Sequence, residues 1–147
     1  MKRLKQLVPV LAGFAAIMWL NGGVAGAART KDVCVASPTG GGGFNTFVFR
    51  DVEPLARGAA VALRGIYFTT GSARLAPLHG SAAMGYDGVV RLGFFVHSTA
   101  QSLNDFTGAG VTDADFVGDV TFDNDGDFAA NGTLTMQKVD CATLVIP

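Results

Sequence analysis

The sequence predicts an all-β domain, an antiparallel meander of about eight strands that closes into a small barrel, with a two-sheet β-sandwich as the alternative. Three observations predict this class. Apolar residues alternate with a period of two along several segments, and Asp-Gly pairs, which favour tight hairpin turns, separate such segments. The composition is rich in Gly (20) and Phe (11) and only 16% charged, which favours strands and turns over helices.

Residues 1–27 have the layout of a secretory signal peptide. Basic residues at positions 2–5 precede an uncharged apolar run at 7–20, and the small residues at 25–27 form a cleavage site. An uncleaved membrane anchor is the alternative, but a polar and glycine-containing break leaves the run too short to span ~30 Å of hydrocarbon. We therefore expect an exported protein, periplasmic or extracellular, with residues 28–147 as one domain and no membrane span.

The charge of the expected mature chain argues against nucleic acid as a partner. Residues 28–147 contain eight basic and twelve acidic side chains, so their net charge is −4. A protein that binds nucleic acid usually carries a basic excess.

The two cysteines, Cys34 and Cys141, lie near the two ends of this domain. An even number of cysteines in an exported protein predicts a disulfide, which here would tie the first strand to the last. The closed loop has about a hundred residues, for which the chain-entropy estimate is ~4–5 kcal/mol of stabilisation.

The strands can be placed from the alternation and from the turns that bound it. Val90, Leu92 and Phe94 form one apolar face of a typical segment, and Asp87-Gly88 and Asp125-Gly126 are expected hairpin turns. The expected strands, in order, are Val33–Ala36, Phe44–Phe49, Ala59–Thr69, Ser81–Tyr86, Val89–Val96, Phe116–Phe122, Phe128–Val139 and Cys141–Ile146, and a ninth strand near Phe106–Val111 is the alternative to a loop there. A barrel is favoured because closure removes both edge strands.

This layout of successive hairpins in a small exported chain resembles lipocalin-like and avidin-like barrels. The resemblance implies a lumen that holds a small ligand. The chain lacks the short Gly-x-Trp motif typical of lipocalins, so the resemblance assigns no site residue.

One polar cluster is a candidate metal site. Asp123, Asp125 and Asp127 alternate around an expected hairpin tip, and calcium prefers oxygen ligands. The alternative is a turn that uses Asp and Asn for local hydrogen bonds. Apart from calcium at this cluster, we expect no cofactor.

The search for catalytic residues is negative. There is no Gly-x-Ser-x-Gly motif and no His or Cys spacing typical of a metal site, and His79 and His97 fall in separate strands or turns. An enzyme would depend on one of these histidines paired with an aspartate.

The leading functional hypothesis is therefore a non-catalytic barrel that binds a small apolar molecule. The alternative is a structural or interaction protein with a filled core and a protein partner. Inward-facing small residues such as Gly118, Ala130 and Gly132 would leave room in the lumen, whereas inward-facing Phe94 and Phe122 would fill it.

Overall fold

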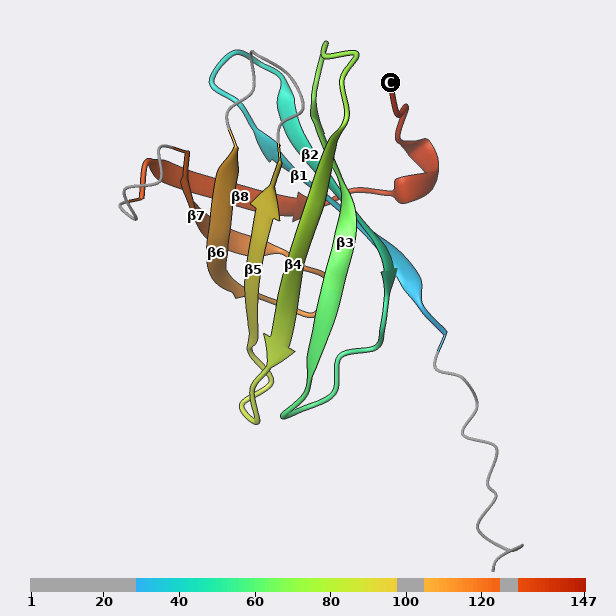
Figure 1. Ribbon diagram of the computed structural model, residues 1–147, viewed down its shortest axis with the longest axis vertical. Coiled ribbons are helices and arrows are strands. Elements are labelled where there is room, and N and C mark those ends of the chain that lie inside the picture. The colour runs from blue at the N-terminus through green and yellow to red at the C-terminus, as the bar shows by residue number, and fades with distance from the viewer. Residues whose placement is uncertain (1–28, 98–104, 125–129) are drawn as a thin grey trace, which may run out of the picture.

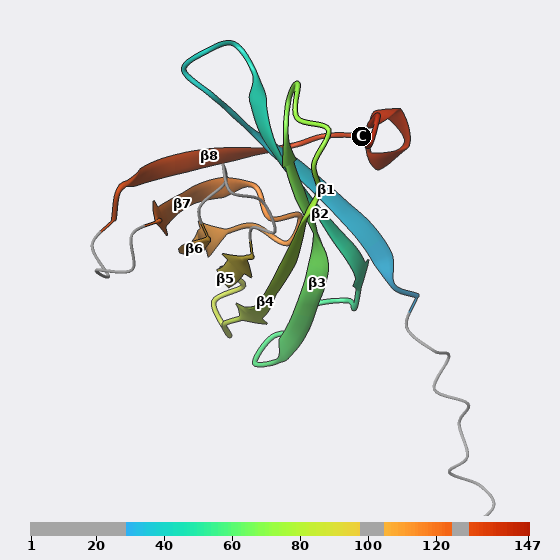
Figure 2. The same cartoon turned by 45° about the horizontal axis from the view of Figure 1, so that its top comes forward.

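The computed structural model describes residues 29–97, 105–124 and 130–147, which form a closed barrel of eight antiparallel strands (Figures 1 and 2). Each strand pairs with the next, and the last pairs with the first. The all-β meander barrel is thus confirmed, and the sandwich alternative is wrong. The strands are β1 (Lys31–Pro38), β2 (Phe44–Val52), β3 (Ala60–Thr69), β4 (Ala76–Met84), β5 (Val90–Val96), β6 (Phe106–Thr112), β7 (Gly118–Asp123) and β8 (Gly132–Lys138).

The turn between β4 and β5 forms as its sequence predicts. Gly88 has a φ of 83°, a conformation that glycine adopts without a steric penalty. The Asp87 carboxylate accepts a hydrogen bond from the Val89 amide at 3.0 Å. The second Asp-Gly pair, Asp125-Gly126, lies outside the described residues.

The structure departs from the expected strands most clearly at the C-terminal segment and at Phe116. The predicted strand Cys141–Ile146 is wrong, because Asp140 caps a short 3₁₀ helix, η1 (Cys141–Thr143), and accepts the Ala142 amide at 3.0 Å. Phe116 lies before β7 in a turn, with a φ of 61°. No helix in the described residues is long and apolar enough to cross a bilayer.

The lumen holds one continuous apolar cluster, which we call the lumen cluster. Each strand either places inward-facing side chains in this cluster or packs them against it, as the period-two pattern requires. Aromatic rings at centroid distances of 4.9–6.4 Å connect along it, in the order Phe116, Phe49, Phe94, Phe47, Tyr67, Phe106 and Phe122.

Two inward-facing glycines of the lumen are covered by these rings. A Cβ atom at Gly108 would collide with the Phe94 ring, and one at Gly132 would meet the Phe122 ring. The small residues thus make space for phenylalanine side chains. Phe116, fully buried, adds its ring against Phe49 at 4.9 Å.

The seam between β1 and β8 is the shortest strand pairing of the barrel. Two residue pairs form it, Val35 with Lys138 and Ala36 with Gln137. The Val139 amide continues the seam by donating to the Cys34 carbonyl at 3.0 Å. β1 ends at Pro38, which has no amide hydrogen to donate to a neighbouring strand.

Candidate functional site

The disulfide expected from the sequence is present, on the outside of the barrel. Cys34 and Cys141 are bonded, with Cα atoms 5.4 Å apart. Val33 and Val35 point into the lumen, so Cys34 between them points outward. Cys141 belongs to η1 and not to the last strand, so the bond fastens the C-terminal segment (residues 139–147) to the outer face of β1. In Figure 1 this segment lies outside the ring of strands.

A second apolar cluster, the outer cluster, lies beneath this segment. Cys34, Val48 and Phe68 are buried there, although they face away from the lumen. Their partners are partly buried residues of β3 and of the C-terminal segment: Ile66, Val139, Cys141 and Leu144. The outer face of β1–β3 is therefore covered at one end by a non-strand segment that the disulfide holds in place.

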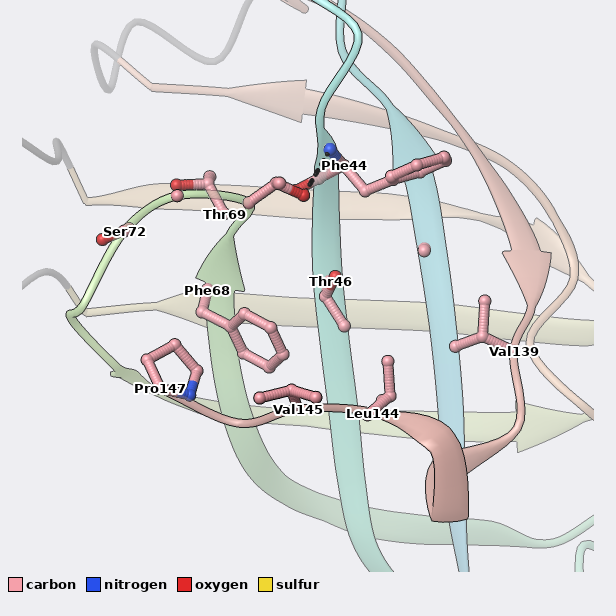
Figure 3. A pocket seen from close by; sticks show the side chains of 12 residues that line it. Phe44, Thr46, Phe68, Thr69, Ser72, Val139, Leu144, Val145 and Pro147 are labelled. Carbon is pink, nitrogen blue, oxygen red and sulfur yellow. Dashed lines mark hydrogen bonds between the residues drawn. The ribbon is translucent and has the colours of Figure 1, made fainter.

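Next to the outer cluster, the same strands and the C-terminal segment form a hollow, the outer groove (Figure 3). Its volume is about 310 Å³. Ala36, Thr46 and Phe68 are register partners across β1, β2 and β3, and they form its floor. The full lining is Ala36, Phe44, Thr46, Phe68, Thr69, Thr70, Gly71, Ser72, Val139, Leu144, Val145 and Pro147.

The shape of the outer groove follows from side-chain size. Ala36 and Thr46 are small, whereas Phe44 and Phe68 are large and stand on either side of Thr46 in Figure 3. Leu144 and Val145 form the opposite wall, and the Val145 side chain is exposed. No charged residue is among the lining residues, so the groove presents an apolar surface to solvent.

Thr46 is the buried polar side chain of the groove. Three polar residues are buried in the described chain, and of these only Thr46 lines the groove, with 4% of its surface exposed. Its hydroxyl has no hydrogen-bond partner among the described residues, and no fully enclosed side-chain oxygen among them lacks a partner. The hydroxyl therefore opens to the space of the groove, and Figure 3 shows Thr46 at its centre.

Two further hydroxyls at the groove form hydrogen bonds within the chain. Thr70 Oγ1 accepts the Phe44 amide at 2.9 Å, and Ser72 Oγ accepts the Arg74 amide at 3.2 Å. These bonds fix the loop after β3 against the start of β2.

A charged hollow of about 500 Å³ lies on the other side of Val139. In it, Asp115 accepts hydrogen bonds from Lys31 at 2.6 Å and from Lys138 at 2.8 Å. The hydrogen bond from Lys138, and after it the one from Lys31, lowers the pKa of Asp115 to about 2. The Asp115 carboxylate in turn raises the pKa of Lys138. Because the lysines lie at the start of β1 and the end of β8, this ion triad supports the short seam.

The proposed calcium ligands are only partly described. Asp123 ends β7, and Asp125 and Asp127 lie outside the described residues. The described residues hold no group of three or more His, Cys, Asp or Glu side chains that could bind a metal. Two aspartates near them in sequence have partners in the chain, since Asp119 accepts from Thr135 at 2.8 Å and Asp115 binds the lysines. Calcium binding therefore stays a prediction.

The two histidines remain on the outside of the barrel. His97 Nδ1 lies 3.2 Å from an Asp105 carboxylate oxygen, and the His97 ring stacks on Phe95 at 6.1 Å. Both members of the His97–Asp105 pair are about half exposed. His79 is also exposed, on β4.

Tyr67 places a buried phenol in the lumen. Tyr67 donates from its hydroxyl to Asn45 Oδ1 at 2.8 Å. Burial raises the pKa of Tyr67 to about 12, so the side chain stays a neutral hydrogen-bond donor across the physiological range.

The outer groove is the feature that the sequence did not predict. Its floor depends on which residues of three strands become neighbours, and alternation alone does not give that register. A signal was present in the apolar residues Val139, Leu144 and Val145 after the last strand. The sequence analysis placed the first of them at the end of that strand and the other two in the further strand Cys141–Ile146.

Comparisons with known proteins do not add a family to this geometry. The chain matches no protein-family model, and neither the curated proteins nor the solved structures yield a match. The functional argument therefore depends on the residues described above.

Proposed function

We propose that this chain is an exported, non-catalytic binding protein that holds a small apolar molecule in the outer groove. The observation that carries the proposal is an apolar hollow of about 310 Å³ with no charged lining residue, on the outside of a barrel. Ligand pockets typically have volumes of ~300–1,000 Å³ and mainly hydrophobic linings with a few polar groups. The groove lies at the lower end of this range, which favours a small ligand.

The lumen supports the proposal by contrast. The strand layout resembles that of lipocalin-like and avidin-like barrels, in which the ligand would bind inside the barrel. Here phenylalanine rings cover the inward-facing Gly108 and Gly132, and connected rings run from Phe116 to Phe122. An eight-stranded barrel has an interior that its own side chains can fill or that can hold one small ligand, and here the rings occupy the space beside these glycines. We therefore place the ligand on the outer face and treat the lumen as the scaffold.

Export supports the proposal as well. The signal-peptide layout of residues 1–27 and the disulfide between Cys34 and Cys141 both fit an oxidising compartment outside the cytoplasm. N-terminal sequencing of the protein recovered from an exported fraction should begin near Ala28. Recovery of an intact Met1 would contradict export by this route.

A tryptophan reporter tests binding at the groove. Trp19 is the one tryptophan and belongs to the expected signal peptide, so the mature chain is expected to have none. Phe44 is 46% exposed at the groove, and Phe44→Trp places a fluorophore there. We expect naphthalene, a neutral hydrocarbon probe, to shift the emission of this variant to the blue in a saturable titration.

The matched control is Tyr86→Trp, because Tyr86 is 82% exposed and does not line the groove. Its emission should not change over the same naphthalene range. A saturable change in both variants, or in neither, would contradict binding at the outer groove.

A further inference from the structure

We infer that the ligand of the outer groove is a neutral molecule with an apolar body and a single hydrogen-bonding group, such as an alcohol or a ketone, which pairs with the Thr46 hydroxyl. This inference rests on the proposed binding function and names the ligand class. Its size is on the order of ten non-hydrogen atoms, from the groove volume of about 310 Å³ and the ~30 Å³ that a water molecule occupies in the liquid.

The first argument is the state of Thr46 itself. The residue is 4% exposed, its hydroxyl has no hydrogen-bond partner within the described part of the chain, and that hydroxyl opens to the groove. A polar group taken out of water without a hydrogen bond is costly, and nearly all buried polar groups in proteins have partners. A ligand that fills the groove would shield this hydroxyl from solvent, so it must supply a hydrogen bond of its own to avoid the cost.

The second argument is the position of Thr46 within the groove. Phe44, Phe68 and Leu144 surround it with apolar surface (Figure 3). A ligand with its polar atom at Thr46 can bury the rest of its surface against these side chains. A second polar group on the ligand would face these apolar side chains unpaired unless it reached the threonine and serine hydroxyls of residues 69–72, which also line the groove.

The third argument is charge. No side chain of the lining is that of Lys, Arg, His, Asp or Glu, so an ionised head group would lose water and gain no counter-ion from a side chain. The charged side chains nearby, Lys31, Asp115 and Lys138, lie in the separate hollow beyond Val139 and bind one another. A hydroxyl can donate or accept, so alcohols and ketones both fit Thr46.

The test compares three ligands that have the same number of non-hydrogen atoms: 2-phenylethanol, propylbenzene and the 2-phenylethylammonium ion. Each is titrated into the Phe44→Trp protein with Thr46 present and with Thr46→Val, which removes the hydroxyl and keeps the shape. We expect the valine substitution to weaken 2-phenylethanol about threefold to tenfold, the range for one neutral hydrogen bond. Propylbenzene should bind the valine variant as well as, or better than, the threonine form.

Two further variants control for indirect effects. Thr46→Ser retains the hydroxyl and should retain the affinity for 2-phenylethanol within about twofold, since one neutral hydrogen bond accounts for more than that. Thr107→Val removes an exposed threonine hydroxyl from β6, away from the groove, and should change nothing. The ammonium ion should bind at least about tenfold more weakly than the alcohol, because its charge is desolvated without a partner.

The outcomes separate this inference from the proposed function. If propylbenzene and naphthalene bind but Thr46→Val weakens propylbenzene as much as the alcohol, the groove binds apolar molecules and the inferred ligand class is wrong. Equal affinity for the ammonium ion and the alcohol would overturn it as well. If no ligand in the series binds, both the ligand class and the proposed function are wrong.

Discussion

The two faces of β1–β3 show how one set of strands builds two different apolar regions. Their inward face is part of the lumen cluster, which all eight strands complete. Their outward face is covered by the C-terminal segment, whose contacts leave the outer groove open. The lumen is closed by strand pairing, whereas the outer region depends on a tether, the disulfide between Cys34 and Cys141. We infer that the inward face provides stability and the outward face provides the binding site.

The hydrogen bonds of the C-terminal segment explain this dependence. Val139 donates to the Cys34 carbonyl, but the described hydrogen bonds farther along are local, such as those from Thr143 to Asp140 and from Leu144 to Cys141. Apolar contacts and the disulfide therefore hold the wall of the groove.

The largest effect is expected from a phenylalanine pair on β2 whose members face opposite sides. Phe47→Ala removes a fully buried ring that contacts Tyr67 and Phe94, and should lower the free energy of unfolding by about 3–5 kcal/mol. Phe44→Ala, at the half-exposed groove position, should cost less than about 1 kcal/mol. Equilibrium urea unfolding of both variants measures the difference, and equal losses would contradict the assignment of stability to the lumen.

The next effect is expected from removing the tether. The disulfide closes a sequence separation of 107 residues, and its loss in Cys34→Ala/Cys141→Ala should cost roughly 2–4 kcal/mol. Far-ultraviolet circular dichroism should show that the barrel still folds, because the eight strands and the lumen cluster do not include the C-terminal segment.

In the same double variant, naphthalene binding at the groove should weaken at least about tenfold, since the Leu144 and Val145 wall is no longer held. Undiminished binding would show that the wall does not depend on the disulfide.

A smaller effect is expected from the ion triad at the seam. The pKa of Asp115 is lowered from 3.8 to about 2, so its contribution to stability is present above pH 3.8 and is lost as the pH falls toward 2. Asp115→Asn should be less stable than the parent at pH 7 by under about 1 kcal/mol, since the pairs are partly exposed. Near pH 2 the two proteins should have nearly the same free energy of unfolding. A difference in this free energy that stays constant between pH 7 and pH 2 would show that the ion triad does not cause it.

The smallest effect is expected from calcium. Millimolar calcium and a chelator, at matched ionic strength, should give coincident thermal midpoints if Asp123, Asp125 and Asp127 only shape a turn. A rise in the thermal midpoint that calcium alone causes, and that Asp125→Ala removes, would instead establish a calcium site at these residues.

Much of the barrel could be predicted from local pattern. Alternation placed β5 nearly at its observed bounds, because its inward residues are apolar and most of its outward residues are exposed. β6 was only a possible further strand, because its two glycines favour a loop and its outward Val111 interrupts the alternation of polarity. β4 was predicted to begin at Ser81 but begins at Ala76, since Pro77 and Gly80 reduce the apparent strand preference while still pairing with β3.

The parts that could not be predicted depend on contacts between distant segments. Val145 and Ile146 have high strand preference, but the cap at Asp140 and the bond from Cys141 to Cys34 direct their segment across the outside. Phe116 was placed in a strand, whereas four hydrogen bonds within the turn, two of them to Asp113 Oδ1, hold it at positive φ. The outer groove requires both this routing and the register of three strands.

The most direct test of the account is where an apolar ligand perturbs the protein. Two-dimensional amide NMR spectra of the oxidised chain should be recorded during a titration with 2-phenylethanol. We predict that the shift changes gather at the groove residues Thr46, Phe68 and Leu144 and leave the lumen residues Phe49 and Phe94 nearly unchanged. Changes centred on Phe49 and Phe94 would contradict the account, because they would place the ligand inside the barrel.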